Sequence, residues 1–255
     1  MTIPKKIGQA AFQWLGLGVT HYDTLVALKE YKNSLDLVLA MQRGDLSRVP
    51  MMMGQSKSQL KQDFFALTES GFKRNGYFVE FGATDGVQLS NSYLLEKEYG
   101  WSGILAEPAR CWHQALRANR NSWIETNCVW RDSDSVVKFN EVDDAALSTI
   151  AAFKDADGHS RHETACYEVK TISLNDLLAK YDAPREIDYL SIDTEGSEFE
   201  ILRNFDFTRH RFKVITCEHN FTPMRENLFE LLSENGYVRK HIELSRWDDW
   251  YVHQD

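Results

Sequence analysis

Apolar residues along this chain occur in two patterns, as short continuous runs and at helical spacing. Residues 77–82 form an apolar run that leads into a turn with two glycines, and residues 103–107 form a second run. Between them, residues 91–99 carry apolar side chains at helical intervals. This alternation is typical of parallel β-strands joined by crossover helices. We therefore expect residues 77–107 to form a β-α-β unit on which the rest of the fold is built.

The same alternation continues almost to the C-terminus. The expected strands are residues 77–82, 103–107, 122–128, 136–139, 167–172, 187–193 and 213–218. The expected helices are residues 58–67, 91–99, 109–119, 174–181, 197–204 and 223–235. Two last strands, residues 237–244 and 249–253, are expected to be antiparallel and to close the sheet. The pattern predicts an α/β fold, with a doubly wound, mostly parallel sheet and helices on both faces.

Two segments differ from this core. Leucine and valine recur at roughly helical spacing between His21 and Arg43, which predicts a helical N-terminal extension over residues 1–55, before a domain over residues 56–255. The extension could be a helical cap on the core, an arm that forms a homodimer or a lid over a site, and the pattern barely separates these. Residues 141–164 are polar and irregular, and we expect an inserted loop there that shapes substrate access.

Composition narrows the class of protein. A formal net charge of -9 argues against a nucleic-acid partner, which requires a basic surface. No apolar run is long enough for a membrane span, and the N-terminal stretch has no convincing signal-peptide cleavage site. The four cysteines have no CxxC spacing and are typical of free thiols in a reducing compartment. These features predict a cytoplasmic globular protein.

Polar residues stand where the expected strands end. In a parallel α/β sheet these ends meet at one edge, where ligands bind. The residues at these ends are Glu80, Gly82 and Asp85 after the first strand, Glu107 after the second, Asn127 after the third, Asp193 after the strand 187–193, and Glu218 with His219 after the strand 213–218. We expect them to converge on one site.

The glycine turn and the acid after the second strand indicate the kind of ligand. The turn lacks the GxGxxG pattern of a dinucleotide-binding loop. Asp85 within it would repel phosphate and suits a positively charged ligand such as a sulfonium. Glu107 is placed to accept hydrogen bonds from the two hydroxyls of a ribose.

At this point the chain resembles the FkbM-type S-adenosylmethionine-dependent methyltransferases. The matching stretches are residues 58–63, 78–86, 104–108, 169–177, 187–198 and 214–218, together with Asn91. The resemblance covers about residues 56–245 and implies a Rossmann-like class I methyltransferase fold. Members of the family mostly methylate hydroxyl oxygens, often on sugars or polyketide-like natural products. By this resemblance, the cofactor-binding residues would be Gln59, Gln62, Glu80, Gly82, Asp85, Asn91, Glu107, Asn127 and Asp193.

Three residues are the candidates for catalysis: Asp193, Glu218 and His219. In one interpretation they hold a divalent metal ion, Mg²⁺, Mn²⁺ or Fe²⁺, that lowers the pKa of the acceptor hydroxyl. In a second, His219 is the general base and a carboxylate orients it. In a third, Asp193 only caps the following helix and His219 is an ordinary loop residue.

These observations predict an S-adenosylmethionine-dependent O-methyltransferase. Its expected acceptor is the hydroxyl of a sugar or a nucleotide-linked sugar, for a surface polysaccharide or a secondary metabolite. The alternatives are a non-catalytic S-adenosylmethionine-binding protein, a methyltransferase for a non-sugar natural product, and a nucleotide-binding enzyme of another chemistry.

Overall fold

The computed structural model describes residues 32, 52, 54–143, 145–153 and 162–254. The chain divides into two compact units, residues 1–42 and residues 43–255. Apart from Lys32, the predicted N-terminal helices lie outside the described residues. The extension, its boundary at residue 55 and a homodimer through it therefore stay predictions. Among the described helices, none is long and apolar enough to cross a lipid bilayer.

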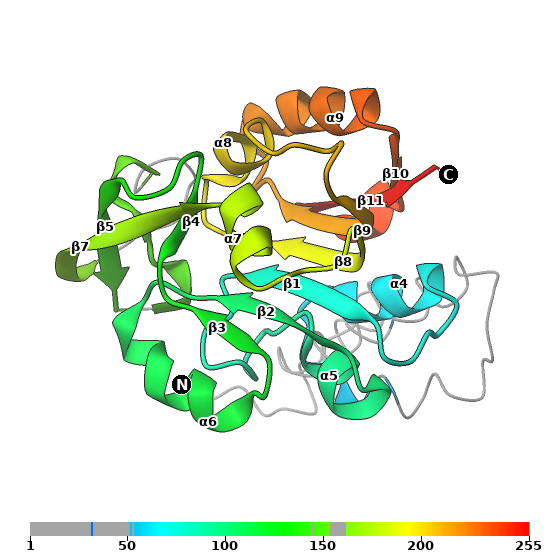
Figure 1. The fold of residues 1–255 in the computed structure, drawn as a ribbon, viewed down its shortest axis with the longest axis horizontal. Helices are drawn as coiled ribbons and strands as arrows, with labels where there is room; N and C mark the ends of the chain where they lie inside the picture. Colours follow the sequence, from blue (N-terminus) through cyan, green and yellow to red (C-terminus); the bar gives the residue numbers. More distant parts are fainter. Residues whose placement is uncertain (1–31, 33–51, 53, 144, 154–161, 255) are drawn as a thin grey trace, which may run out of the picture. The chain divides into compact units, whose positions relative to one another are not determined.

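A seven-stranded sheet forms the centre of the second unit (Figure 1). Its strands, in spatial order, are β10 (Tyr237–Lys240), β11 (Asp248–His253), β9 (Arg211–Glu218), β8 (Glu186–Ile192), β1 (Tyr77–Phe81), β2 (Ser102–Ala106) and β3 (Trp123–Glu125). All neighbours are parallel except the two pairs that contain β11. The predicted doubly wound sheet with an antiparallel C-terminal strand is confirmed.

Helices pack on both faces of this sheet. They are α4 (Gln62–Glu69), α5 (Tyr93–Tyr99), α6 (His113–Asn119), α7 (Leu174–Lys180), α8 (Glu198–Leu202), α9 (Met224–Glu234) and α10 (Ile242–Ser245). Figure 1 shows α8 and α9 on one side of the sheet and α5 and α6 on the other. The central strands β1 and β8 are buried along almost their whole length, which explains their continuous apolar runs.

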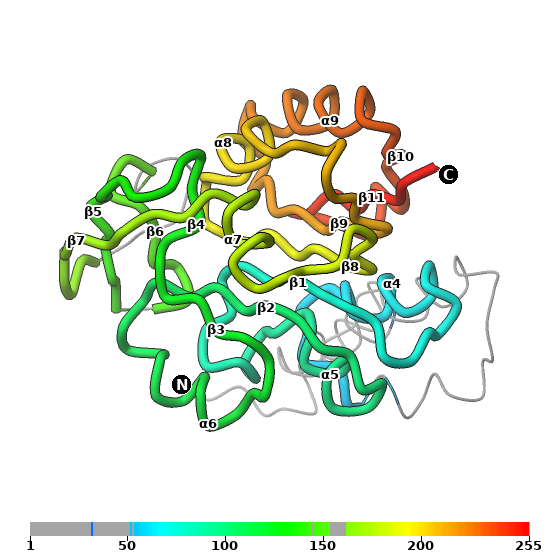
Figure 2. The backbone as a smooth tube through the Cα atoms, viewed as in Figure 1, coloured from blue at the N-terminus to red at the C-terminus, as the bar shows by residue number. Residues whose placement is uncertain are grey.

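A second, four-stranded sheet follows β3, in the order β4 (Cys128–Trp130), β7 (Glu163–Ser173), β5 (Val136–Val142) and β6 (Thr149–Ile150). Figure 2 traces the chain as it leaves the main sheet after β3, builds this second sheet and returns through β7 to α7. Two 3-10 turns, η3 (Ala145–Leu147) and η4 (Ala151–Phe153), flank β6, and a third, η2 (Arg110–Trp112), precedes α6.

Three predicted elements are wrong in detail. The strand 122–128 is two strands, because Glu125 Oε1 accepts hydrogen bonds from the N–H groups of Thr126 and Asn127, both at 2.9 Å, and these turn the chain. The predicted loop 141–164 contains β6 and the two flanking 3-10 turns. The strand 237–244 ends at Lys240, and α10 follows it.

Helix starts follow local hydrogen bonding. Ser173 caps α7, because its Oγ accepts the N–H of Asp176 at 3.1 Å, as the sequence predicts. Helix α4 begins only at Gln62, whose N–H donates to Ser58 Oγ at 2.8 Å. The predicted helix start at Ser58 is therefore four residues too early.

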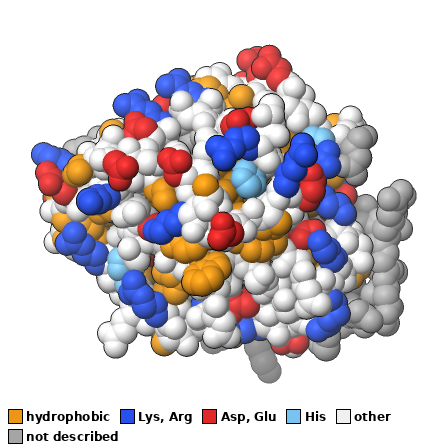
Figure 3. All heavy atoms as spheres, viewed as in Figure 1, with side chains coloured by type: hydrophobic (Ala, Val, Ile, Leu, Met, Phe, Trp, Pro, Cys, Tyr) orange, Lys and Arg blue, Asp and Glu red, His pale blue; other side chains and the backbone are white. Residues whose placement is uncertain are grey.

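An aromatic pair, of which one member is exposed, marks the edge of the main sheet. Trp123 of β3 is 60% exposed and stacks on Tyr181, with 5.7 Å between the ring centroids. On the face drawn in Figure 3, charged side chains are spread over most of the surface, and hydrophobic side chains gather just below the middle, where Figure 1 draws β2 and β3.

A fully buried arginine holds the loop between β1 and α5. The Arg120 side chain is 0% exposed, and its Nε lies 2.9 Å from Glu96 Oε2 and one terminal nitrogen 3.9 Å from Glu80 Oε2. Its remaining N–H groups donate to three oxygens of the loop, namely Gly86 O, Ser90 Oγ and Ser92 Oγ. Although burial acts to raise it, the pKa of Glu96 is lowered to about 2, because Arg120 and several hydrogen bonds stabilise the carboxylate.

Replacing this arginine should destabilise the fold strongly. We predict that Arg120→Met lowers the free energy of unfolding by about 3–5 kcal/mol, because Glu80 would stay buried without its cation. The matched control is Arg131→Met, which removes an exposed ion pair with Asp132 and should cost about 0–1 kcal/mol. Urea titration followed by fluorescence and circular dichroism measures both. Equal losses in the two variants would contradict the role of Arg120.

Candidate functional site

A cavity of about 520 Å³ lies at the carboxyl ends of β1, β2, β8 and β9. It has the size of a small-molecule site. Of the residues that the sequence proposed for cofactor binding, six line it: Gln59, Glu80, Gly82, Asn91, Glu107 and Asp193. The convergence of strand-end residues on one cavity is what the parallel sheet predicts.

Gly82 allows two strand ends to touch. Its φ is +75°, and a Cβ built there would lie 2.2 Å from the backbone oxygen of Asp193. A side chain at this position would therefore collide with the chain that leaves β8. The absence of a side chain brings Asp193 into the cavity beside the glycine turn.

Glu80 holds the segment that follows the glycine turn, residues 90–92. It is 2% exposed, and its Oε1 accepts the Asn91 N–H at 2.6 Å while Oε2 accepts the hydroxyls of Ser90 and Ser92. Burial raises the pKa of Glu80, and the nearby Arg120 partly offsets this. Asn91 Nδ2 donates to Ser191, but Asn91 Oδ1 has no hydrogen-bond partner in the described part of the chain. This buried oxygen is available to accept a hydrogen bond from a ligand.

The carboxylate of Glu107 is held in the cavity wall by two backbone N–H groups. Its Oε2 accepts the Thr84 N–H and its Oε1 the Ala109 N–H, both at 2.8 Å. Burial raises the pKa of Glu107 to about 7, and the negative charges of Glu141 and Asp193 act in the same direction. Each oxygen retains a second acceptor position, so the side chain can receive two adjacent hydroxyls, as a ribose offers.

The other three proposed cofactor residues lie outside the cavity lining. Asp85 Oδ1 accepts the N–H groups of Val87 and Gln88, and thereby closes the turn. Gln62 Nε2 donates at 2.7 Å to Asp248, a buried residue whose pKa is raised to about 8 by burial. Asn127 donates its N–H to Glu125. Their contacts are structural, and a direct role in cofactor binding stays a prediction.

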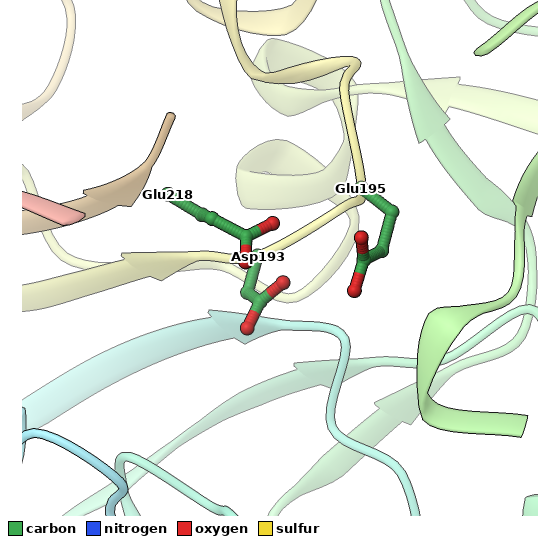
Figure 4. Close-up of side chains that lie close together, drawn as sticks. All are labelled: Asp193, Glu195 and Glu218. Atoms are coloured by element: carbon green, nitrogen blue, oxygen red, sulfur yellow. The ribbon is translucent and has the colours of Figure 1, made fainter. Parts of the chain in front are cut away.

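Three carboxylates of the cavity lining lie close together (Figure 4). Asp193 follows β8, Glu218 ends β9, and Glu195 comes from the turn after Asp193; one oxygen of each lies within 4.8 Å of the other two. Burial raises the pKa of Asp193 to about 6, and burial with the charge of Asp193 holds the pKa of Glu218 well above its usual range. Glu218 Oε2 has no hydrogen-bond partner among the described residues. We call these three residues the acid cluster.

The turn that carries Glu195 is held from two sides. Glu195 has a left-handed φ of +58°, which is uncommon for a residue with a side chain. Glu198 Oε1 accepts the N–H groups of Thr194 at 2.9 Å and Gly196 at 3.1 Å. From the second sheet, Thr149 Oγ1 donates to Glu195 O at 3.1 Å. These contacts keep the carboxylate in the cluster despite the unusual backbone.

The imidazole of His219 does not face the cavity. Its Nδ1 accepts the Phe221 N–H at 2.9 Å, and its Nε2 lies 3.8 Å from Asp249 Oδ1. Successive side chains at a strand end point to opposite faces, so Glu218 and His219 cannot both enter the cavity. The structure thus brings together two members of the sequence-predicted trio, Asp193 and Glu218, with Glu195 as the third carboxylate.

Sequence reasoning expected the segment 141–164 to shape substrate access but did not identify the apolar wall of the cavity, which this segment forms in part. That wall comes from the second sheet and its turns, and consists of Cys128, Val129, Phe139, Ala145, Ala146, Leu147 and Ile150. Phe221 and Trp247 line the cavity as well, and Phe221 is 68% exposed. The only sequence signal for Glu195 was its place in the polar stretch Asp193–Gly196, directly after a buried strand.

The fold and the site are those of the S-adenosylmethionine-dependent methyltransferase class. A glycine turn follows β1, and a buried acid, Glu107, follows β2. The profile of the Methyltransferase FkbM domain matches residues 80–239. The chain therefore belongs to the FkbM methyltransferase family, which confirms the resemblance noted in its sequence, and it is an S-adenosylmethionine-dependent methyltransferase. A search of curated proteins gives no match.

Three of the solved structures that this chain resembles are weak likenesses. A precorrin-6y C5,15-methyltransferase from Geobacter metallireducens is 11% identical, with 74% of this chain and 85% of that chain covered and a TM-score of 0.41. A ribosomal protein L11 methylase from Lactobacillus delbrueckii subsp. bulgaricus is 8% identical, with 76% and 77% covered and a TM-score of 0.39. A putative RNA methyltransferase from Pyrococcus horikoshii is 11% identical, with 84% of each chain covered and a TM-score of 0.35. At these scores they carry no argument about function.

The pKa of Glu107 predicts how cofactor binding depends on pH. Above about pH 7 its carboxylate is ionised and accepts hydroxyl hydrogen bonds; as pH falls through 7 it takes up a proton and loses acceptor strength. Affinity for S-adenosylhomocysteine should therefore fall by up to about tenfold per pH unit below 7. Glu107→Gln should bind about 10–100-fold more weakly at pH 8 and show little of this dependence.

Calorimetric titration at several pH values measures both effects. Glu168→Gln, at an exposed position of β7, is the matched control and should behave like the unaltered protein. A pH dependence that survives in Glu107→Gln would show that another group binds the ribose.

Proposed function

We propose that this methyltransferase transfers the methyl group to a hydroxyl oxygen of a sugar-type acceptor. The observation that carries the proposal is the acid cluster, which shares one cavity with Glu80 and Glu107. A sugar hydroxyl is a weak acid, so its reaction needs a group that takes its proton and fixes its direction. Carboxylates beside the cofactor residues can do both.

Each residue has a distinct part in this proposal. Glu107 holds the ribose end of S-adenosylmethionine, and Asn91 Oδ1 offers a further acceptor at the glycine turn. S-adenosylmethionine supplies a methyl group on a positively charged sulfur. Asp193, beside the turn, orients the acceptor hydroxyl and takes its proton as the new oxygen–carbon bond forms. Glu195 brings a further carboxylate beside Asp193, and Glu218, whose raised pKa favours its protonated form, lies next to both.

A divalent ion, which the sequence suggested, would have its ligands in the acid cluster. Its donors would be carboxylate oxygens of Asp193, Glu195 and Glu218, a set that suits Mg²⁺ or Mn²⁺. The imidazole of His219, which would favour Mn²⁺ or Fe²⁺, lies on another side of β9. Such an ion would supply Lewis-acid assistance to the acceptor hydroxyl.

Asp193 is the residue whose loss should stop the reaction. We predict that Asp193→Asn lowers kcat by about 10²–10⁴-fold, because the amide cannot take the hydroxyl proton. Binding of S-adenosylhomocysteine should change by less than about tenfold. Transfer of a labelled methyl group to a panel of sugars measures the first, and calorimetry measures the second. Asp182→Asn, at an exposed position, is the control; unchanged turnover in Asp193→Asn would remove Asp193 from catalysis.

Chelation tests the metal. If a divalent ion assists the reaction, EDTA should abolish methyl transfer, and Mg²⁺ or Mn²⁺ should restore it in the unaltered protein but not in Glu195→Gln. If EDTA leaves methyl transfer unchanged and no added ion alters it, the carboxylates activate the acceptor hydroxyl without a metal ion.

A further inference from the structure

The turn that follows β9, residues 219–222, brings an aromatic side chain to the cavity. His219 O accepts the Thr222 N–H at 2.8 Å, which closes the turn, and its two central residues, Asn220 and Phe221, both line the cavity. Phe221 is 68% exposed, whereas Trp123, another exposed aromatic residue of the described chain, lies outside the cavity lining. An aromatic ring in the lining of a cavity is a contact surface for a ligand.

The backbone of this turn is one that phenylalanine rarely adopts. Both central residues are left-handed, with φ of +43° at Asn220 and +56° at Phe221. In turns with two left-handed residues asparagine is a common first residue and glycine the usual second one. A phenylalanine in the second place is strained by its own Cβ. Such strain occurs where a side chain is needed for function and the surrounding residues hold it in place.

A buried histidine holds the strained residue. His219 is 4% exposed, its Nδ1 accepts the Phe221 N–H at 2.9 Å, and the two rings meet edge to face with 5.1 Å between their centroids. Burial lowers the pKa of His219, which favours the neutral ring whose Nδ1 can accept a hydrogen bond. The N–H groups of His219 and Asn220 donate to Trp247 O at 2.8 and 3.2 Å. The turn is thereby joined to a second aromatic residue of the cavity lining.

The order of the strands places this turn away from the ribose end of the cavity. β8 and β1 separate β9 from β2, and Glu107 follows β2. With the ribose at Glu107, as in the proposed function, the end of β9 lies toward the reacting end of the cofactor. Phe221 also follows closely on Glu218 of the acid cluster. Its ring is therefore placed to contact the acceptor.

We propose that Phe221 is the surface against which the ring of the acceptor packs, and that His219 is the positioning residue that holds it there. The acceptor is then a cyclic sugar that presents a face of C–H groups to the phenyl ring. Carboxylates of the acid cluster accept hydrogen bonds from its hydroxyls. This inference rests on the proposed function and adds how the acceptor is recognised.

The chemistry of a pyranose ring fits this arrangement. The C–H groups on one of its faces are apolar and slightly positive, and the face of an aromatic ring is slightly negative. Its hydroxyls point outward from the ring, so that one sugar can pack on Phe221 and still donate to carboxylates. An open-chain polyol has similar hydroxyls but no flat face. We therefore expect cyclic sugars to be better acceptors than the matching open-chain polyols.

The variant Phe221→Gly separates acceptor binding from folding. Glycine has no Cβ and adopts the left-handed backbone without strain, so the melting temperature should not fall. Loss of the ring should raise the KM for the sugar by about tenfold or more with little change in kcat, because it removes binding that is equal in the ground and transition states. Affinity for S-adenosylhomocysteine should stay within about twofold. Phe221→Tyr keeps the ring and should keep the KM.

Two variants of His219 test its positioning role. Asparagine offers an oxygen near the place of Nδ1, so His219→Asn should raise the KM less than His219→Leu, which cannot accept the Phe221 N–H. Trp123→Ala removes an exposed aromatic ring outside the cavity and is the matched control, with an unchanged KM. The measurements are transfer of a labelled methyl group to methyl glycosides and to glucitol, calorimetry with S-adenosylhomocysteine, and thermal unfolding.

Each outcome supports or overturns the inference. An unchanged KM in Phe221→Gly would overturn it and leave the methyltransferase function intact. A clear fall in melting temperature would assign Phe221 to stability instead, and an equal loss of affinity for S-adenosylhomocysteine would assign it to the cofactor. Transfer to glucitol as efficient as to a methyl glucoside would show that the ring is not recognised. If the unaltered protein binds S-adenosylhomocysteine but methylates no sugar, the proposed function fails and the inference with it.

Discussion

The structure depends on one buried charge, the guanidinium of Arg120. It holds Glu80 and Glu96 and three oxygens of the loop between β1 and α5. Glu80 in turn accepts the Asn91 N–H. Arg120 therefore stabilises, directly or through Glu80, the cavity wall formed by the loop between β1 and α5. A loop built from small polar residues could not keep this shape without such a centre. This wall of the cavity is therefore held in place by contacts among the protein's own residues.

The other part of the cavity is organised by the three carboxylates of the acid cluster, which lie close together. Asp193 and Glu218 come from neighbouring strands, and a contact between Gly82 and Asp193 sets how close β8 comes to the turn. The second sheet contributes through Thr149, which holds the turn of Glu195. Two sheets thus determine one cluster of carboxylates.

Most of the central sheet and several residues of the cavity could be predicted from the sequence, because buried parallel strands leave continuous apolar runs whose ends are easy to place. Glu80, Gly82, Glu107, Asp193 and Glu218 were found in that way. The sequence did not predict that Glu195, and not His219, is the third member of the acid cluster. Its membership depends on which face each side chain takes at a strand end and on the left-handed backbone at Glu195. The second sheet was missed because β4 and β6 are only three and two residues long.

We propose that the cavity binds S-adenosylmethionine with its ribose at Glu107 and its reacting end at the acid cluster. A crystal structure of the complex with S-adenosylhomocysteine tests this most directly. We expect both ribose hydroxyls within hydrogen-bond distance of the Glu107 carboxylate, and the sulfur on the side of the cavity where Asp193 lies. A ligand bound outside this cavity, or with its ribose at the acid cluster, would contradict it.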